Sequence, residues 1–172
     1  MTQADREADF TEYISARSPW LVRVAYLLCG DWHRAEDLAQ VAAGKLYQHW
    51  ARAARADSID AYARRVLVNT FITEKRSGWS RLAILTREPD EPAGADADLD
   101  VSLDLRAALD RLPPRQRATV VLRFYCDLTI EQTAEAMGCS AGNVKSQSSR
   151  ALSTLRKRLE PSLHPTFEGL SS

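Results

Sequence analysis

The sequence predicts an all-α protein made of two small helical domains joined by a flexible acidic linker. Apolar residues recur at intervals of three, four and seven, which is typical of helices with one apolar face. The first half shows no strand alternation. Residues 77–101 combine prolines, glycines and a run of acids that cannot bury itself, as expected of a linker. We therefore predict a first domain at residues 1–76, a linker at 77–101, a second domain at 102–160 and a tail at 161–172.

The first domain is predicted to contain three or four helices. The first spans residues 10–28, and its apolar face comprises Phe10, Tyr13, Ile14, Leu21, Val24, Ala25 and Leu28. Gly30 ends this helix, and Asp31 caps a second one that runs to about Trp50. Its apolar face comprises Ala35, Leu38, Ala42, Leu46, Tyr47 and Trp50. Either Asp57 or Ser58 begins a third helix, whose buried side comprises Tyr62, Val66, Leu67 and Phe71.

The second domain begins where the helical period returns, at Ser102. The first apolar stripe comprises Leu103, Ala107, Leu109 and Leu112. The sequence Leu-Pro-Pro at 112–114 ends this helix and begins the next, because proline fits a first turn but not a helix interior. The apolar stripe of the next helix comprises Ala118, Val121, Leu122 and Tyr125.

The segment that follows predicts a helix-turn-helix. Thr129 and Gln132 form a capping box at the head of a helix of about two turns. Gly138 suits the left-handed residue that ends it, and Ser140 caps the next helix. A short helix, a tight glycine turn and a longer helix with basic residues outward are typical of this motif, whose second helix fits the major groove of DNA.

The long helix divides into two faces. The inward face comprises Val144, Ala151, Leu152, Leu155 and Leu159. The outward face of its first three turns comprises Asn143, Lys145, Ser146, Ser149 and Arg150. Lysine and arginine contact guanine edges or phosphates, and asparagine pairs with adenine. Lys145 lies near the positive end of the helix dipole, where a cation is unfavourable, which favours a binding role. Residues 156–158 either meet the DNA backbone or complement the helix dipole.

The charge distribution and the cysteine content exclude several classes of protein for this chain. The 172 residues contain 23 basic and 23 acidic side chains, but residues 77–104 sum to −5 and residues 105–172 to +4. Local charge sets the field that a polyanion meets. The three cysteines share no CxxC spacing, so we expect buried thiols rather than disulfides or a zinc site. No signal segment or membrane span is evident, which predicts a cytoplasmic protein without membrane insertion.

Two groups of segments carry a family resemblance. Residues 108–156, ALDRLPPRQRATVVLRFYCDLTIEQTAEAMGCSAGNVKSQSSRALSTLR, resemble region 4 of bacterial sigma factors. The segments GDWHRAEDLAQ and AYARRVLVNTFITEKR resemble region 2. Together, over about residues 8–158, the chain resembles the extracytoplasmic function (ECF) sigma factors, in the short actinobacterial SigE-like type rich in alanine and arginine. The resemblance implies an alternative sigma factor that binds core RNA polymerase and promoter DNA and promotes melting.

The resemblance also implies roles for particular residues. The second domain would read the minus-35 element, through Ser140, Asn143, Lys145, Ser146, Ser149 and Arg150. The first domain would bind and melt the minus-10 element, through Tyr62, Arg64, Arg65, Asn69, Lys75 and Arg76. Asn69 would lie at the pocket that accepts an unstacked base, with a loop at 51–58 as one wall. Tyr62 has an equally plausible role as a core aromatic.

The second predicted helix would bind the clamp helices of the largest polymerase subunit, through Asp37, Leu38 and Gln40. Many family members have an acid directly after the glutamine, whereas this chain has Val41. One polar contact with polymerase is therefore expected to be missing. An anti-sigma factor is a further expected partner, because two apolar-faced domains on a loose linker would suit clamping.

Two rival interpretations are weaker. A helix-turn-helix regulator that acts without being a polymerase subunit would need a sensor domain upstream, and residues 1–76 show no alternating strand and helix pattern. An enzyme would need a metal site or an acid–base cluster, and His33, Glu36 and Asp37 are the candidates. Only His33 and Asp37 form an i, i+4 pair, and no third ligand is evident. No glycine-rich phosphate loop or nucleophile motif is present. We expect no metal, no cofactor and no catalysis. The linker acids could cover the DNA-reading surface, and the tail could be a protease signal or a frayed end.

Overall fold

The computed structural model describes residues 2–76 and 102–163, and every regular element in these two ranges is a helix. The elements are α1 (Gln3–Cys29), α2 (Trp32–Gln48), α3 (Trp50–Ala53), α4 (Ile59–Arg76), α6 (Leu103–Asp110), α7 (Pro114–Val120), η1 (Val121–Tyr125), α8 (Ile130–Met137) and α9 (Ala141–Leu163). The predicted linker, and the tail beyond residue 163, lie outside the described residues. No described helix is both long and apolar enough to cross a bilayer.

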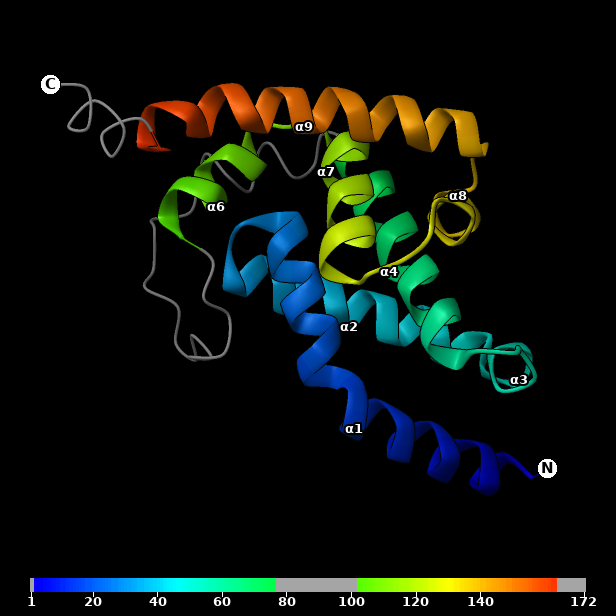
Figure 1. Ribbon diagram of the computed structural model, residues 1–172. Coiled ribbons are helices and arrows are strands. Elements are labelled where there is room, and N and C mark those ends of the chain that lie inside the picture. Colours follow the sequence, from blue (N-terminus) through cyan, green and yellow to red (C-terminus); the bar gives the residue numbers. More distant parts are fainter. Residues whose placement is uncertain (1, 77–101, 164–172) are drawn as a thin grey trace, which may run out of the picture.

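Helix α1 begins earlier than the sequence pattern predicted. The Thr2 hydroxyl accepts from the Asp5 N–H, and the Asp5 carboxylate accepts from the Thr2 N–H, so a capping box starts the helix at Gln3. The helix ends as predicted at Gly30, which has a left-handed φ of 83°. The apolar pattern missed residues 3–9, which are all exposed except the half-buried Arg6, because this end of α1 projects from the molecule (Figure 1).

Helices α2 and α4 complete the first domain. Asp31 caps α2 by accepting from the Arg34 N–H, and the Ser58 hydroxyl accepts from the Ala61 N–H at the head of α4. The second contact decides between the two predicted caps, in favour of Ser58. The core of this domain includes Leu28, Leu38, Leu46, Trp50, Leu67 and Phe71, each with 2% or less of its surface exposed.

The second domain departs from its predicted apolar stripe at η1. Pro114 occupies the first turn of α7 as predicted. After Val120 the chain forms a π-helical turn, which is wider than an α-helical turn and therefore rotates the residues after it. Ala118, Val121 and Leu122 are buried, but Tyr125 is 42% exposed. The prediction that Tyr125 belongs to the apolar stripe was wrong for this reason.

The predicted apolar stripe of α6 was partly wrong, although Leu109 and Leu112 are buried as predicted. Leu103 is 87% exposed and Ala107 is exposed, whereas Ala108 and Leu109 are buried. The buried face includes Arg106, which is only 7% exposed. A pattern of apolar residues cannot identify this face, because a charged side chain occupies its centre and is paired inside the protein.

The helix-turn-helix forms as predicted. Thr129 and Gln132 make the capping box of α8, Gly138 has a left-handed φ of 66°, and the Ser140 hydroxyl accepts from the Asn143 N–H at the start of α9. Two details differ. Leu152 is 37% exposed instead of buried. Helix α9 continues past Pro161 to Leu163, since the φ angle of proline is compatible with a helix even though its missing N–H removes one hydrogen bond.

The two domains pack against each other. A single hydrophobic core contains residues of both, and α1 contacts α6 and α7 while α4 contacts α7 and α8. Helix α9 lies across the side of the molecule opposite to the N-terminal half of α1 (Figure 1). The sequence predicted both domains but not their contact.

Candidate nucleic-acid interface

The outward face of α9 is a continuous polar strip. Asn143, Lys145, Ser146, Ser149 and Arg150 are all exposed. Val144, which lies among them in sequence, and Ala151, which directly follows Arg150, are completely buried against the rest of the protein. This arrangement presents the polar strip to solvent on a helix whose orientation is set by its apolar side. Ser140 is exposed as well, and its hydroxyl also caps the helix.

The basic residues near the end of α9 are exposed too. They are Arg156, Lys157 and Arg158. Exposure is compatible with a contact to the DNA backbone and with a contribution to the helix dipole, so both interpretations from the sequence stay open.

Helix α4 is fixed by an ion pair with α1. The Arg17 guanidinium donates to both oxygens of Asp60, at 3.0 and 2.7 Å, and the Tyr13 hydroxyl donates to the same carboxylate at 2.7 Å. Burial, together with the neighbouring Asp60 carboxylate, raises the pKa of Tyr13 well above its ordinary value. Because Asp60 lies in the first turn of α4, these contacts position the face of α4 that follows.

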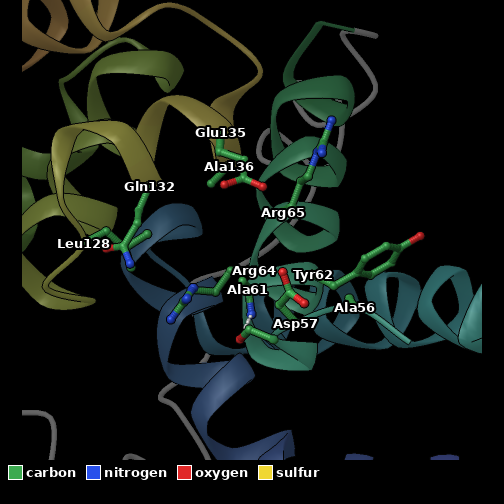
Figure 2. Close-up of a pocket in the computed structure, with 11 residues that line it drawn as sticks. Ala56, Asp57, Ala61, Tyr62, Arg64, Arg65, Leu128, Gln132, Glu135 and Ala136 are labelled. Carbon is green, nitrogen blue, oxygen red and sulfur yellow. Dashed lines mark hydrogen bonds between the residues drawn. The ribbon is translucent and has the colours of Figure 1, made fainter. Parts of the chain in front are cut away.

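The predicted minus-10 residues do not all share one surface. Arg65 and Asn69 are exposed and Tyr62 is half-buried, at spacings of three and four that place them on one side of α4. Arg64 points elsewhere, with its guanidinium carbon 5.7 Å from the centre of the Trp20 ring. In Figure 2, Arg64 extends toward Gln132 and Leu128, whereas Tyr62 extends the opposite way. The side chain of Arg76 lies outside the described residues.

A cavity of about 550 Å³ adjoins Tyr62. Its lining residues are Ala51, Arg52, Arg55, Ala56 and Tyr62. The segment at 51–58, predicted from the resemblance to form one wall of a base pocket, therefore does line a cavity beside an aromatic ring. Asn69 does not line it. Arg52 and Arg55 were missed by sequence reasoning, although two arginines three residues apart, one within α3 and one just after it, are a visible signal of positive charge.

A second cavity, of about 440 Å³, lies between α4 and α8 (Figure 2). The first domain lines it with Ala56, Asp57, Ser58, Ala61, Tyr62, Arg64 and Arg65. The second domain lines it with Leu128, Gln132, Glu135 and Ala136. Two of the predicted minus-10 arginines therefore face the first helix of the helix-turn-helix.

A third cavity, of about 390 Å³, collects basic residues from both domains. Lys75 and Arg150 both line it, together with Arg115, Ile72, Pro113, Pro114, Gln116 and Gln147. Burial lowers the pKa of Lys75, and the nearby guanidinium groups of Arg34 and Arg117 lower it further. A residue predicted to contact the minus-10 element and one predicted to contact the minus-35 element thus lie beside the same cavity.

The predicted polymerase-binding surface lies on α2. Asp37 and Gln40 are exposed on one side of the helix. Leu38 is only 1% exposed, so its side chain supports this surface from within the core and cannot itself make a contact. Val41 is 44% exposed, which places an apolar side chain beside Gln40 at the surface. The predicted contact residues are therefore reduced to Asp37 and Gln40.

The thiol groups are free. Cys29 is buried, as predicted, and Cys126 and Cys139 are partly buried. Burial raises the pKa of both Cys29 and Cys126 to about 11. Thiols with raised pKa values are poor nucleophiles near neutral pH.

Comparison with known proteins identifies the class. Residues 13–81 match the family model described as Sigma-70 region 2, and residues 102–155 match the model described as Sigma-70, region 4. A protein with these two regions, the second containing a helix-turn-helix, is a sigma factor of bacterial RNA polymerase.

Similar proteins narrow this class to one family of sigma factors. It is 40% identical to the RNA polymerase sigma-E factor of Streptomyces avermitilis over 159 residues, which cover 88% of this chain and 86% of that protein. It is 30% identical to the ECF RNA polymerase sigma factor SigE of Mycolicibacterium smegmatis, over 86% of this chain and 60% of that protein. The chain belongs to the ECF sigma factor family.

A solved structure shows the same fold. It is the sigma factor RpoE in complex with the anti-sigma factor NepR, from Bartonella quintana. The TM-score is 0.71 at 24% sequence identity, over 88% of this chain and 97% of that one.

Proposed function

We propose that this ECF sigma factor binds core RNA polymerase and brings it to promoters by reading a minus-35 element with α9 and binding the melted minus-10 element with α4. The observation that carries this proposal is the exposed polar strip on α9, whose apolar side is fixed against the second domain. A helix presented in this way fits the major groove. The first domain supplies a second DNA surface.

At the minus-35 element, the side chains of α9 suit direct contact with base edges. Lys145 and Arg150 are donors for guanine, and Asn143 can pair with adenine. A good bidentate contact discriminates against the wrong base by about 1 to 3 kcal/mol. One helix therefore gives limited selectivity, and the positive charge adds affinity that does not depend on sequence.

At the minus-10 element, α4 and the preceding turn suit a separated strand. Single-stranded DNA binds to positively charged surfaces that carry an aromatic platform. Tyr62 adjoins the 550 Å³ cavity, with Arg52 and Arg55 at its rim. Extrusion of a base costs a few kcal/mol, and a cavity beside an aromatic ring offsets part of that cost. Arg65 and Asn69 extend the same side of α4.

Core polymerase would contact α2. Asp37 and Gln40 form a polar patch suited to the clamp helices of the largest subunit, and Val41 replaces the acid that many family members have. Two weak DNA-binding domains bind a promoter more tightly when a third molecule holds both of them, because binding of the first raises the effective concentration of the second. Core RNA polymerase would be that third molecule.

Three further points belong to the proposal. An anti-sigma factor is a suitable regulator, and the fold is shared with a sigma factor that was solved with one. The protein would act in the cytoplasm, where polymerase and DNA are. It would have no catalytic activity of its own, since its sequence contains no nucleophile motif or phosphate loop.

Transcription in vitro tests the proposal. Purified core polymerase is given a library of promoter fragments, with and without this chain, and transcript starts are mapped. We expect start sites that appear only with the chain and share sequences near minus-35 and minus-10. Starts that appear equally without it would contradict the proposal. A unique, tight footprint by the chain alone would instead favour a regulator that acts without being a polymerase subunit.

A further inference from the structure

The cavity of about 390 Å³ lies where three helices meet. It receives side chains from the last two turns of α4, the first turn of α7 and the early turns of α9. Helix α7 contacts both of the other helices, and α9 crosses over its N-terminal end in Figure 1. Sites for small molecules typically have volumes of roughly 300 to 1,000 Å³. The cavity is therefore large enough for a small organic molecule.

The charged side chains that line this cavity are all cations within residues 2–76 and 102–163. They are Lys75 of α4, Arg115 of α7 and Arg150 of α9. Lys75 and Arg115 are half-buried, and Arg150 is exposed. Side chains of one sign that line a concave site focus the field there and raise the local concentration of ions of the opposite sign. The lining therefore favours an anion that carries several negative charges.

The surroundings of Lys75 strengthen this positive field. Burial lowers the pKa of Lys75, and the nearby guanidinium groups of Arg34 and Arg117 lower it further. The Asp110 carboxylate acts in the opposite direction, but it is already paired with Arg106. A negative charge bound beside Lys75 would favour the charged form of its amino group. The ammonium group and a bound anion would therefore stabilise each other.

The uncharged side chains of the cavity suit a flat ring with a polar edge. Ile72, Pro113 and Pro114 supply apolar surface. Gln116 and Gln147, both half-buried, supply amides that can donate and accept hydrogen bonds. A nucleobase has a π-face that packs on such surfaces and an edge with donors and acceptors. The cavity thus combines cations for phosphate groups with a wall and two amides for a base.

We propose that this cavity binds a nucleoside polyphosphate, whose phosphate groups lie against the three cations and whose base lies against the apolar wall. The inference goes beyond the proposed promoter function, which requires no small ligand. DNA also carries phosphates, but the polar strip of α9 is the outward face of one helix, whereas the lining of this cavity converges from three. Because Arg150 belongs to both surfaces, a bound nucleotide and a minus-35 element would compete for its guanidinium group.

Calorimetric titration of the free chain tests which part of the ligand is recognised. The probes are ATP, inorganic pyrophosphate and adenosine, used without divalent cations because the described lining offers no carboxylate to bind one. We expect a single ATP per chain, weaker binding of pyrophosphate and no measurable binding of adenosine. Pyrophosphate that binds as tightly as ATP would overturn the contact with the base. Adenosine that binds as tightly would overturn the role of the cations, and a chain that binds no probe would overturn the site.

Two substitutions locate the binding site, each with a matched control. Arg115→Gln removes a cation from the cavity, whereas Arg111→Gln removes an exposed arginine outside its described lining. Gln147→Glu introduces a carboxylate into the cavity, whereas Gln48→Glu introduces one at the exposed end of α2. Loss of one charge-assisted hydrogen bond should weaken ATP binding by about tenfold or more.

Both cavity variants should show this loss, and both controls should bind ATP like the wild-type chain. Equal affinities in a cavity variant and its control would overturn the site. Circular dichroism verifies folding, and if Arg115→Gln unfolds, the comparison of Gln147→Glu with Gln48→Glu decides.

Photolabelling locates the bound nucleotide directly. An azido derivative of ATP is irradiated with the wild-type chain, and mass spectrometry maps the labelled residue. We expect label within residues 113–116 or beside Gln147, and protection by excess ATP. Label confined to α2 or to residues 156–158 would overturn the site.

A DNA strand is the rival occupant of this cavity, and a short thymidine oligonucleotide is its probe. An oligonucleotide that binds more tightly than ATP, and loses as much affinity in Arg115→Gln, would make the cavity part of a DNA surface and overturn the proposal. Weaker binding that is insensitive to Arg115→Gln would support it. These measurements use neither polymerase nor a promoter, so a negative result would leave the proposed promoter function standing.

Discussion

Tyr13 and Asp60, which are 47 residues apart, are joined by a 2.7 Å hydrogen bond from the phenol to the carboxylate. Arg17 binds the same carboxylate, so α1 and the first turn of α4 share one polar junction. This junction orients the surface of α4 on which the proposed strand binding depends.

Removal of the phenol hydroxyl should weaken this junction. Tyr13→Phe leaves a half-buried carboxylate with one donor fewer, and we expect the free energy of unfolding to fall by about 1 to 2 kcal/mol. Urea denaturation followed by circular dichroism measures the change. Tyr47→Phe, whose hydroxyl lies in an exposed contact with Glu7, is the control and should change stability less. Equal losses in the two variants would argue against a special role for Asp60.

Arg150 is expected to contribute to minus-35 discrimination. Arg150→Ala should reduce the preference for the correct element by about 1 to 3 kcal/mol, or about 5-fold to 150-fold, because a base contact is lost. Binding to core polymerase should not change. Competition between correct and altered elements for the holoenzyme measures the preference at fixed salt. Arg158→Ala is the comparison, and it should weaken all sequences alike or have no effect.

Asn69 is expected to act in promoter opening. Asn69→Ala removes an exposed amide on the side of α4 that also carries Tyr62 and Arg65. Initial docking on duplex promoter should be nearly unchanged, whereas formation of the open complex should slow. Permanganate footprinting detects unpaired thymines and separates the two steps. If a premelted promoter fails to rescue the variant, its defect lies in docking and the assignment is wrong.

Val41 offers a gain-of-function test for the polymerase surface. Val41→Glu restores the acid that many family members have beside the glutamine, and we expect tighter binding to core polymerase, most visibly at low salt. Fluorescence anisotropy of labelled chain measures the affinity. Leu38→Ala should behave differently. It removes a buried side chain, so we expect a loss of about 2 to 5 kcal/mol of stability rather than a specific loss of binding.

Stability should decline at alkaline pH because of Cys29. Burial raises the pKa of this thiol to about 11 from an ordinary value of 9.0. Below pH 9 the thiol is protonated in both the folded and the unfolded chain. Between pH 9 and 11 only the unfolded chain ionises, which favours unfolding, so stability falls by about 2 to 3 kcal/mol over this interval. Cys29→Ala should have a shallower decline in thermal midpoint with pH, and an unchanged slope would refute the assignment.

Features set by neighbouring residues could be predicted from the sequence. Capping boxes, glycine turns and the outward strip of α9 depend on residues within a few positions of one another, and Thr129, Gly138 and Ser140 all act as expected. The division into two domains followed from the composition of residues 77–101, the family resemblance identified the two regions, and the comparisons confirm both regions. The roles of the individual residues that would contact DNA and polymerase stay predictions.

Features set by distant contacts could not be predicted in this way. Arg106 resembles a solvated cation in the sequence, because its acceptors lie about 80 residues away at the end of α1. The exposure of Tyr125 depends on the π-helical turn, which has no signature in the apolar spacing. Arg64 turns toward Trp20 and α8 for a similar reason: the ring and the cavity that receive it belong to other parts of the fold.

Gly30 satisfies two independent structural requirements because it has no Cβ atom. Its φ of 83° ends α1, and a Cβ at this position would collide with the Asp110 carboxylate of the second domain. Asparagine tolerates the left-handed conformation but not the collision. Any side chain larger than hydrogen at this position would therefore displace the Asp110 carboxylate from its place beside Arg106, so that one substitution would disturb both the end of α1 and the contact between the domains.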